Sequence, residues 1–239
     1  PALLFLTAGG YDPGIPLTIY FLLLLFWTFL PCRDLLKYHY GQVKSALQRR
    51  TVRRKLYRYC GLIFPCIIYP LGGQKALLLS LGIGTLTLWS VELIRKYNPT
   101  VRSMIMSVME PVAKEEEETE ITGTSKYILG CFLASIFPDP LNALSIIMLT
   151  LGDAWAGLVG RRTGLGIWIK GKSTSGSIAC LTACVSASYV FIHMTPSYHL
   201  DLEIILAGSL VATLAEGVSG KWDNLFIAPA AALAMWLLL

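Results

Sequence analysis

Long apolar stretches separated by short polar ones are the main pattern along this chain of 239 residues. Each stretch approaches the roughly 20 apolar residues with which an α-helix crosses the hydrocarbon core of a bilayer. The pattern predicts such segments near residues 14–31, 59–71, 74–93, 127–138, 141–160, 177–194, 202–218 and 225–239. Because the second and fourth segments are short for a full crossing, we expect seven to eight transmembrane helices. The predicted fold is therefore an all-α, polytopic membrane bundle that forms a single membrane domain over residues 1–239.

Composition agrees with a membrane protein. Hydrophobic residues make up 54% of the chain and charged residues only 15%, whereas soluble domains carry roughly 25% charged residues. This balance excludes soluble enzymes, nucleic-acid-binding modules and disulfide-rich secreted domains. The six cysteines show no C-x-x-C spacing and lie mostly in apolar stretches, so we expect them to pack rather than to bind a metal. The first residues carry no charged region of the kind that opens a cleavable signal, so none is expected.

Basic residues gather in the loops on one side of the predicted bundle. These loops span residues 32–58, 95–126 and 161–172, and Lys221 belongs to the same side. The loops on the other side are short and nearly free of Lys and Arg, at residues 72–73, 138–140 and 195–201. Since Lys and Arg are enriched in cytoplasmic loops, the basic side is predicted to be cytoplasmic and the N-terminus to lie outside. Residues 1–31 then form an N-terminal transmembrane helix and residues 32–58 a basic cytoplasmic loop.

Three acidic residues at the cytoplasmic ends of apolar segments are the first functional candidates, because ionisable groups are costly there. Asp153 lies within Gly152-Asp153-Ala154, Glu216 lies near the end of its segment, and Asp223 precedes the last segment. Helix capping would explain Asp223 equally well. A carboxylate in the last turn of a helix, as at Glu216, opposes the helix dipole. Acids at one membrane depth would suit Mg²⁺, which one or two carboxylates plus substrate phosphates usually hold.

The loop after Asp153 is a candidate anion site. Residues 166–173 match G-x-x-x-x-G-K-[ST] letter for letter, but a P-loop requires a buried strand and a soluble α/β sheet around it. A membrane helix precedes this loop, so we interpret the match as accidental. Glycines and hydroxyls before a helix still favour an anion, because the N-terminus of a helix attracts negative charge. The dense basic residues at 49–58 would add guanidinium contacts to a polyphosphate.

These motifs together resemble the signature of the CTP-dependent lipid kinases, which include dolichol kinase, phytol kinase and the yeast-type CTP-dependent diacylglycerol kinase. The resembling motifs are Gly152-Asp153-Ala154 with Gly160, Lys172-Ser173 with Gly176-Ser177, Glu216, and Asp223-Asn224 with Pro229. Upstream, Arg54-Lys55 resembles the family's Arg-Lys pair, and Glu117 or Glu118 with Thr122-Gly123 resembles its acidic loop. The family often has a histidine shortly after Arg-Lys, where this chain has Tyr57-Arg58-Tyr59.

The resemblance implies that residues 59–239 form a CTP-transferase-like catalytic bundle, which transfers the γ-phosphate of CTP to the hydroxyl of a membrane lipid alcohol. The acceptor would be a polyprenol or dolichol, phytol, or diacylglycerol, and Mg²⁺ would be the cofactor. Asp153 would serve catalysis and Mg²⁺-nucleotide binding, with Asp223 and Asn224 as further metal ligands. The expected nucleotide- and phosphate-binding residues are Arg54, Lys55, Gly160, Lys172, Ser173, Gly176 and Ser177. Glu216 would orient or deprotonate the lipid hydroxyl, and Glu117 or Glu118 would contribute from the acidic loop.

Two other functions fit parts of the pattern. A cytidylyltransferase of the CDP-diacylglycerol synthase type would also use CTP and Mg²⁺ in a membrane, but no segment resembles the C-terminal signature of that family. An ion-coupled transporter would use Asp153 and Glu216 as coupling groups, but it predicts acids near the middle of the bilayer rather than at one face. A nucleic-acid partner is not expected, because the basic excess of a membrane protein usually reports its orientation.

Overall fold

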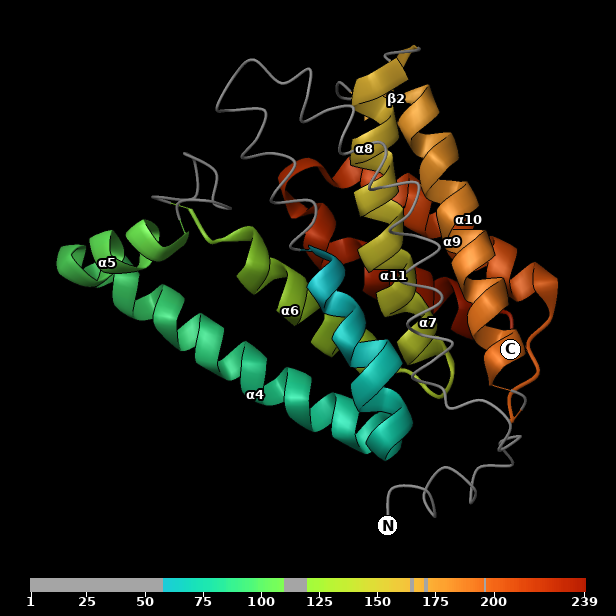
Figure 1. Cartoon of the computed structure of the whole chain (residues 1–239), viewed down its shortest axis with the longest axis horizontal. Coiled ribbons are helices and arrows are strands. Elements are labelled where there is room, and N and C mark those ends of the chain that lie inside the picture. Colours follow the sequence, from blue (N-terminus) through green and yellow to red (C-terminus); the bar gives the residue numbers. More distant parts are fainter. Residues whose placement is uncertain (1–57, 110–119, 164–165, 170–171, 196) are drawn as a thin grey trace.

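The computed structural model describes residues 58–109, 120–163, 166–169, 172–195 and 197–239. The predicted segment 14–31 and the expected site residues Arg54, Lys55, Glu117 and Glu118 lie outside the described residues. Within them the chain folds into helices and one small two-stranded hairpin (Figure 1). The prediction of a helical fold is confirmed.

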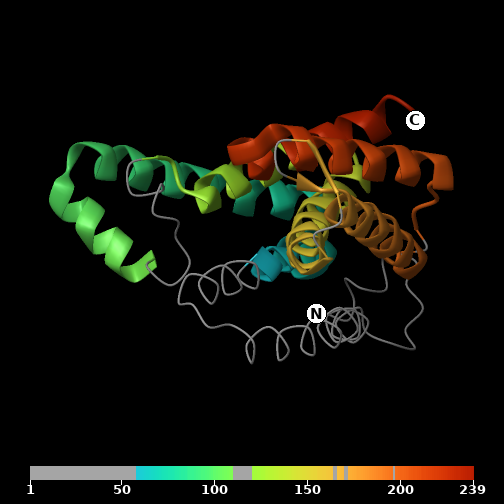
Figure 2. The ribbon, with the colours of Figure 1, turned by 90° about the horizontal axis from the view of Figure 1, so that it is seen from above.

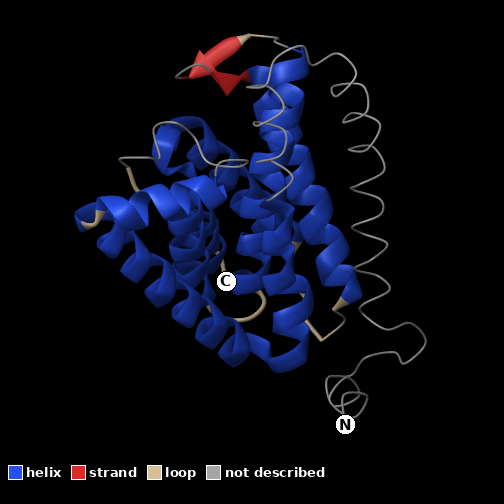
Figure 3. Cartoon of the chain, turned by 60° about the vertical axis from the view of Figure 1, so that its left-hand side comes forward, coloured by secondary structure: helices blue, strands red, loops and turns tan. Residues whose placement is uncertain are grey.

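The first helices run from η1 (Tyr59–Leu62) and η2 (Phe64–Ile68) into α4 (Tyr69–Tyr97), α5 (Pro99–Met109) and α6 (Gly123–Ser135). Next come α7 (Leu141–Ile147), η4 (Met148–Gly152) and α8 (Asp153–Thr163). The last helices are α9 (Thr174–Met194), α10 (Leu202–Ser219), η5 (Gly220–Trp222) and α11 (Asp223–Trp236). An antiparallel hairpin, β1 (Ile167–Ile169) and β2 (Lys172–Ser173), joins α8 to α9 and lies at the end of these helices (Figure 3). The hairpin and α5 lie where the sequence predicted loops.

Two glycines with positive φ divide the longest apolar stretches. Gly73 interrupts α4 with a φ of 62° and a ψ of −159°, and Gly220, with a φ of 56°, follows the end of α10. Residues with a side chain rarely adopt such angles, so glycine suits both positions. The predicted breaks after residues 71 and 218 are thus confirmed.

Four stretches among the described residues are long and apolar enough to cross a membrane, namely Tyr59–Tyr97, Leu141–Arg161, Thr174–Met194 and Leu202–Trp236. They identify the chain as a multi-pass integral membrane protein. The finer count of seven to eight crossings stays a prediction, as does the side of the membrane that each loop faces.

A continuous rod formed by α7, η4 and α8 occupies the centre of the bundle. Every residue from Leu141 to Ala154 is buried. The helix α9 packs along this rod, α11 packs against α10 and α6, and α6 packs against α4; α10 and α11 lie side by side (Figure 2). The η4 segment of the rod is π-helical and ends directly before Asp153. Such one-turn π segments within α-helices occur frequently at functional sites.

Candidate active site

Asp153 forms a buried ion pair with Arg58, the residue just before η1. The side chain of Asp153 is 2% exposed and that of Arg58 is 14% exposed. A carboxylate buried in an apolar bundle requires a cationic partner, since an unpaired charge is costly there. The predicted functional acid therefore has a guanidinium partner, Arg58, which the sequence analysis included among the basic residues at 49–58 but did not name as a site residue.

Tyr127 joins three elements beside this ion pair. Its hydroxyl lies 2.6 Å from Thr150 Oγ1, in the π-helical turn of the central rod. A Cβ atom added to Gly61 would come within 1.9 Å of the same hydroxyl, so only glycine lets η1 approach α6 this closely. The hydrogen bond and the close approach fix the start of η1, and with it Arg58, relative to the rod.

Lys172 lies between two of the predicted acids. The β2 strand carries it to the junction of α10 and α11, where its ammonium forms an ion pair with Glu216. The same Nζ lies 3.7 Å from Asp223 Oδ2. The other Asp223 oxygen, Oδ1, accepts a 2.8 Å hydrogen bond from the backbone N–H of Asn224. Asp223 is the first residue of α11 and Trp222 is its N-cap, so the capping explanation for Asp223 is wrong.

The glycines and serines of the predicted anion loop lie where α8 meets α9. Ser173 caps α9 and accepts a 3.1 Å hydrogen bond from the backbone N–H of Gly176. A Cβ atom on Gly160 would lie 2.5 Å from Ser173 Oγ, and one on Gly176 would lie 2.8 Å from the carbonyl oxygen of Ala156. Ser177, one residue on, is buried. Close helix packing therefore accounts for both glycines, and binding of phosphate by this loop stays a prediction.

Cys180 lies near Glu216 and Lys172 and beside the turn that precedes Asp153. A Cβ atom on Gly152, the neighbour of Asp153, would lie 3.0 Å from Cys180 Sγ and 2.7 Å from Cys184 Sγ. Cys180 also lies within electrostatic range of Glu216 and Lys172. The structure thus brings Lys172, Glu216 and Asp223 together, and it places the turn before Asp153 on the same part of α9. Both cysteines are buried and free, as the packing prediction expected.

Within the described ranges, no group of three or more His, Cys, Asp or Glu side chains comes together as a metal site. Mg²⁺ does not require such a group, because substrate phosphates supply part of its coordination. Asn224 Oδ1 is buried without a hydrogen-bond partner beside Asp223, while its Nδ2 donates to the carbonyl oxygen of Gly123 over 3.3 Å. An unpaired amide oxygen next to a carboxylate fits the oxygen ligands of a hard cation.

Comparison with known proteins finds one distant relationship of interest. No family model and no solved structure matches the chain. The chain is 27% identical over 112 residues to CTP-dependent diacylglycerol kinase 1 of Schizosaccharomyces pombe. The match covers 46% of this chain and 51% of that relative, so the chain spans about half the length of the relative it matches. This relationship supports the resemblance of the chain to the CTP-dependent lipid kinase family.

Two further charged residues lie in or beside apolar segments, although the sequence analysis did not select them as functional candidates. Glu92 lies within the predicted segment 74–93 and is buried. Lys126, at the edge of the next segment, is also buried. Both residues are therefore further candidates for a functional role, because buried charges in apolar segments tend to mark function.

Proposed function

We propose that this protein is a CTP-dependent kinase that transfers the γ-phosphate of CTP to the hydroxyl of a membrane lipid alcohol, with Mg²⁺ as cofactor. The observation that carries the proposal is the contact of Lys172 with both Glu216 and Asp223. These three residues come from separate motifs that resemble the family signature. The distant relationship to a CTP-dependent diacylglycerol kinase supports the same activity.

In this reaction the lipid hydroxyl oxygen forms a bond to the γ-phosphorus. The bond from that phosphorus to the oxygen bridging it to the β-phosphate breaks, CDP leaves with the electron pair, and the hydroxyl proton passes to a carboxylate. Because the transition state of phosphoryl transfer is loose, a kinase contributes mainly positioning and neutralisation of charge. Cationic and carboxylate side chains that meet at one place suit this task.

We assign the role of proton acceptor to Glu216. Its side chain is 4% exposed and forms an ion pair with Lys172, so this carboxylate lies beside a cation that can contact the phosphates. Carboxylates held next to the reacting groups commonly act as general bases.

The remaining candidates bind the nucleotide in this proposal. Asp153, Asp223 and Asn224 would hold Mg²⁺, which when bound neutralises charge on the phosphates. Arg58, paired with Asp153, adds a guanidinium group, which can contact phosphate oxygens in a bidentate manner. Diacylglycerol is the first acceptor to test, because the relative's name specifies it; polyprenol and phytol also present a hydroxyl on an apolar body.

A carboxylate-to-amide exchange at Asp153 tests the proposal. In vesicles that contain diacylglycerol, polyprenol or phytol, Asp153→Asn is expected to lower kcat by a factor on the order of 10²–10³, because charge stabilisation at the phosphates is lost. The matched control is Asp201→Asn, which changes an exposed carboxylate before α10, and asparagine is an equally good N-cap residue. Both variants should insert and purify. Because Asp153→Asn removes the charged partner of Arg58 and should lower stability, turnover is compared at a temperature at which both variants are folded. Near-normal turnover by Asp153→Asn would refute its role.

A further inference from the structure

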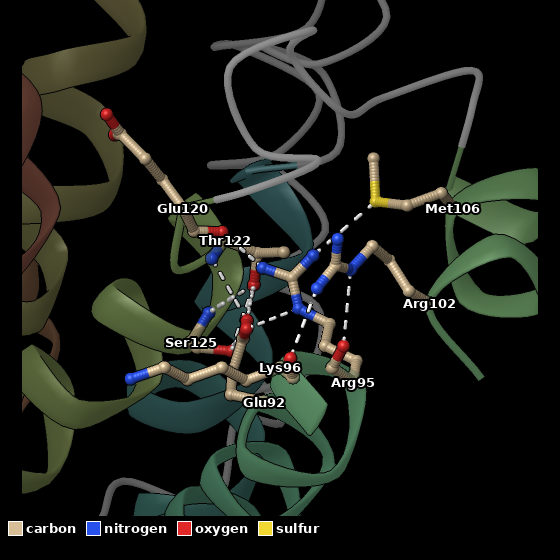
Figure 4. Close-up of polar contacts among 8 residues, drawn as sticks. All are labelled: Glu92, Arg95, Lys96, Arg102, Met106, Glu120, Thr122 and Ser125. Carbon is tan, nitrogen blue, oxygen red and sulfur yellow. Dashed lines mark hydrogen bonds and ion pairs between the residues drawn. The ribbon is translucent and has the colours of Figure 1, made fainter. Parts of the chain in front are cut away.

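A second buried charge pair lies near the end of α4 (Figure 4). Glu92 and Arg95 are 8% and 4% exposed, and Arg95 Nε donates to Glu92 Oε2. Glu92 Oε1 accepts three more hydrogen bonds, from the backbone N–H of Thr122 at 3.0 Å, from Thr122 Oγ1 at 2.6 Å and from Ser125 Oγ at 2.8 Å. The carboxylate thus has four donors from two separate elements.

Arg95 also connects α4 to the turn before α6. Its guanidinium also donates to the carbonyl oxygen of Glu120, and its Nη1 lies 3.6 Å from Met106 Sδ in α5. Glu92 and Arg95 together bind residues 120–125, which form the turn before α6 and its first turn. We call these two residues the α4 clamp.

The turn held by the α4 clamp contacts the segment that carries Asp223. Glu120 Oε1 accepts a 3.1 Å hydrogen bond from Lys221 Nζ, and the two side chains form an ion pair. The carbonyl oxygen of Gly123 accepts a 3.3 Å hydrogen bond from Asn224 Nδ2. Lys126 Nζ donates to the carbonyl oxygen of Lys221 over 3.3 Å and lies 4.4 Å from the centre of the Trp222 ring. These contacts flank Asp223 on both sides.

Stability alone is a weak explanation for the α4 clamp. Burial of an ion pair carries a desolvation cost, and well-packed apolar residues often serve the fold as well or better. A fully satisfied polar network, in contrast, fixes one arrangement of the elements that it joins. Here those elements are α4 and the turn that contacts residues 221–224.

We propose that Glu92 and Arg95 are positioning residues for the candidate active site. They hold the turn at 120–125, and through it they keep Asp223 and Asn224 in place opposite Lys172. The catalytic consequence rests on the proposed function, because it takes Asp223 and Asn224 to be part of the kinase site. The mechanical link between α4 and residues 221–224 stands without it.

Hydrogen exchange in the full chain tests this link. Glu92→Gln removes the charge and leaves Arg95 buried without its carboxylate, so exchange at 120–126 and at 219–226 is expected to accelerate by a factor on the order of a hundred. Exchange in α8 and α9 should not change. The matched control is Thr87→Val, five residues earlier on α4, which removes an exposed hydroxyl bonded only within its own helix.

Faster exchange at 120–126 with no change at 219–226 would overturn the proposal, because the clamp would then serve only its own turn. If Glu92→Gln does not insert, Ser125→Ala removes a single donor to the carboxylate and should give the same pattern with a smaller change. Equal exchange in Ser125→Ala and wild type at 219–226 would overturn the proposal in that case.

Kinetics add a readout that a merely structural clamp would not change. We expect Glu92→Gln to lower kcat for lipid phosphorylation about tenfold, with KM for the lipid unchanged, and Thr122→Ser, which keeps the hydroxyl donor, to retain wild-type kcat. An unchanged kcat in Glu92→Gln would contradict a positioning role. A wild-type protein without kinase activity would instead contradict the proposed function, and the exchange result would still decide whether the clamp positions residues 221–224.

Discussion

Replacement of Arg58 by methionine isolates the contribution of the buried ion pair at Asp153. Methionine keeps an apolar stem of similar length, but the carboxylate, only 2% exposed, would lose its cationic partner. Breaking a buried pair by removing one partner costs about 3–5 kcal/mol. In a chain of this length each kcal/mol shifts the midpoint of thermal unfolding by about 2–4 °C, so Arg58→Met should lower it by about 10 °C.

The assay is the fraction of protein that stays monodisperse in detergent after heating. In the double variant Arg58→Met/Asp153→Asn the orphan charge is gone, so most of the loss should be recovered. Lys221→Met is the matched control, because the ion pair of Lys221 with Glu120 joins side chains that are 54% and 46% exposed, and exposed pairs contribute about 0–1 kcal/mol. The reasoning is refuted if Arg58→Met and Lys221→Met have the same midpoint of thermal unfolding, or if the double variant is no more stable than Arg58→Met.

Two further predictions concern packing. Gly176→Ala places a Cβ atom 2.8 Å from a backbone oxygen and should destabilise the fold by about 1–3 kcal/mol. In Gly84→Ala the new Cβ atom meets its nearest neighbour at an ordinary 3.5 Å, so this variant should stabilise α4 by up to about 1 kcal/mol. Thermal unfolding of both variants measures the difference, and equal effects would contradict close packing of α8 on α9. Thr150→Val removes the 2.6 Å partner of the Tyr127 hydroxyl and should cost about 1–3 kcal/mol; a cost no larger than that of Thr87→Val would contradict this buried hydrogen bond.

Local features of the sequence predicted the helical segments. Runs of apolar residues and the glycines between them determine where a membrane helix begins and ends, so the breaks at Gly73 and Gly220 were predictable. The acids at the ends of these segments were also predictable, since an apolar environment makes a charge conspicuous. Asp223 was open to two explanations, because a residue just before a helix and the first residue of that helix look alike in sequence.

Pairing between distant residues was not predictable from the sequence. Nothing local distinguishes Arg58 from the other basic residues of its loop as the partner of Asp153, since the choice depends on how η1 packs against the central rod. The same holds for the α4 clamp, whose donors Thr122 and Ser125 appear in sequence as ordinary capping residues. The hairpin that delivers Lys172 is too short to leave a strand pattern. Long-range packing, rather than local propensity, creates these contacts.

The position of a radioactive label tests the central claim most directly. The purified chain, in vesicles that contain diacylglycerol, polyprenol or phytol, is given CTP labelled at either the γ- or the α-phosphate, with ATP labelled at the γ-phosphate as the competing donor. The account predicts that the γ-label of CTP enters the lipid fraction, that the α-label stays in water-soluble CDP, and that ATP gives far less product. Transfer of the α-label to lipid would identify a cytidylyltransferase, and no label in any of these lipids would contradict the proposed kinase.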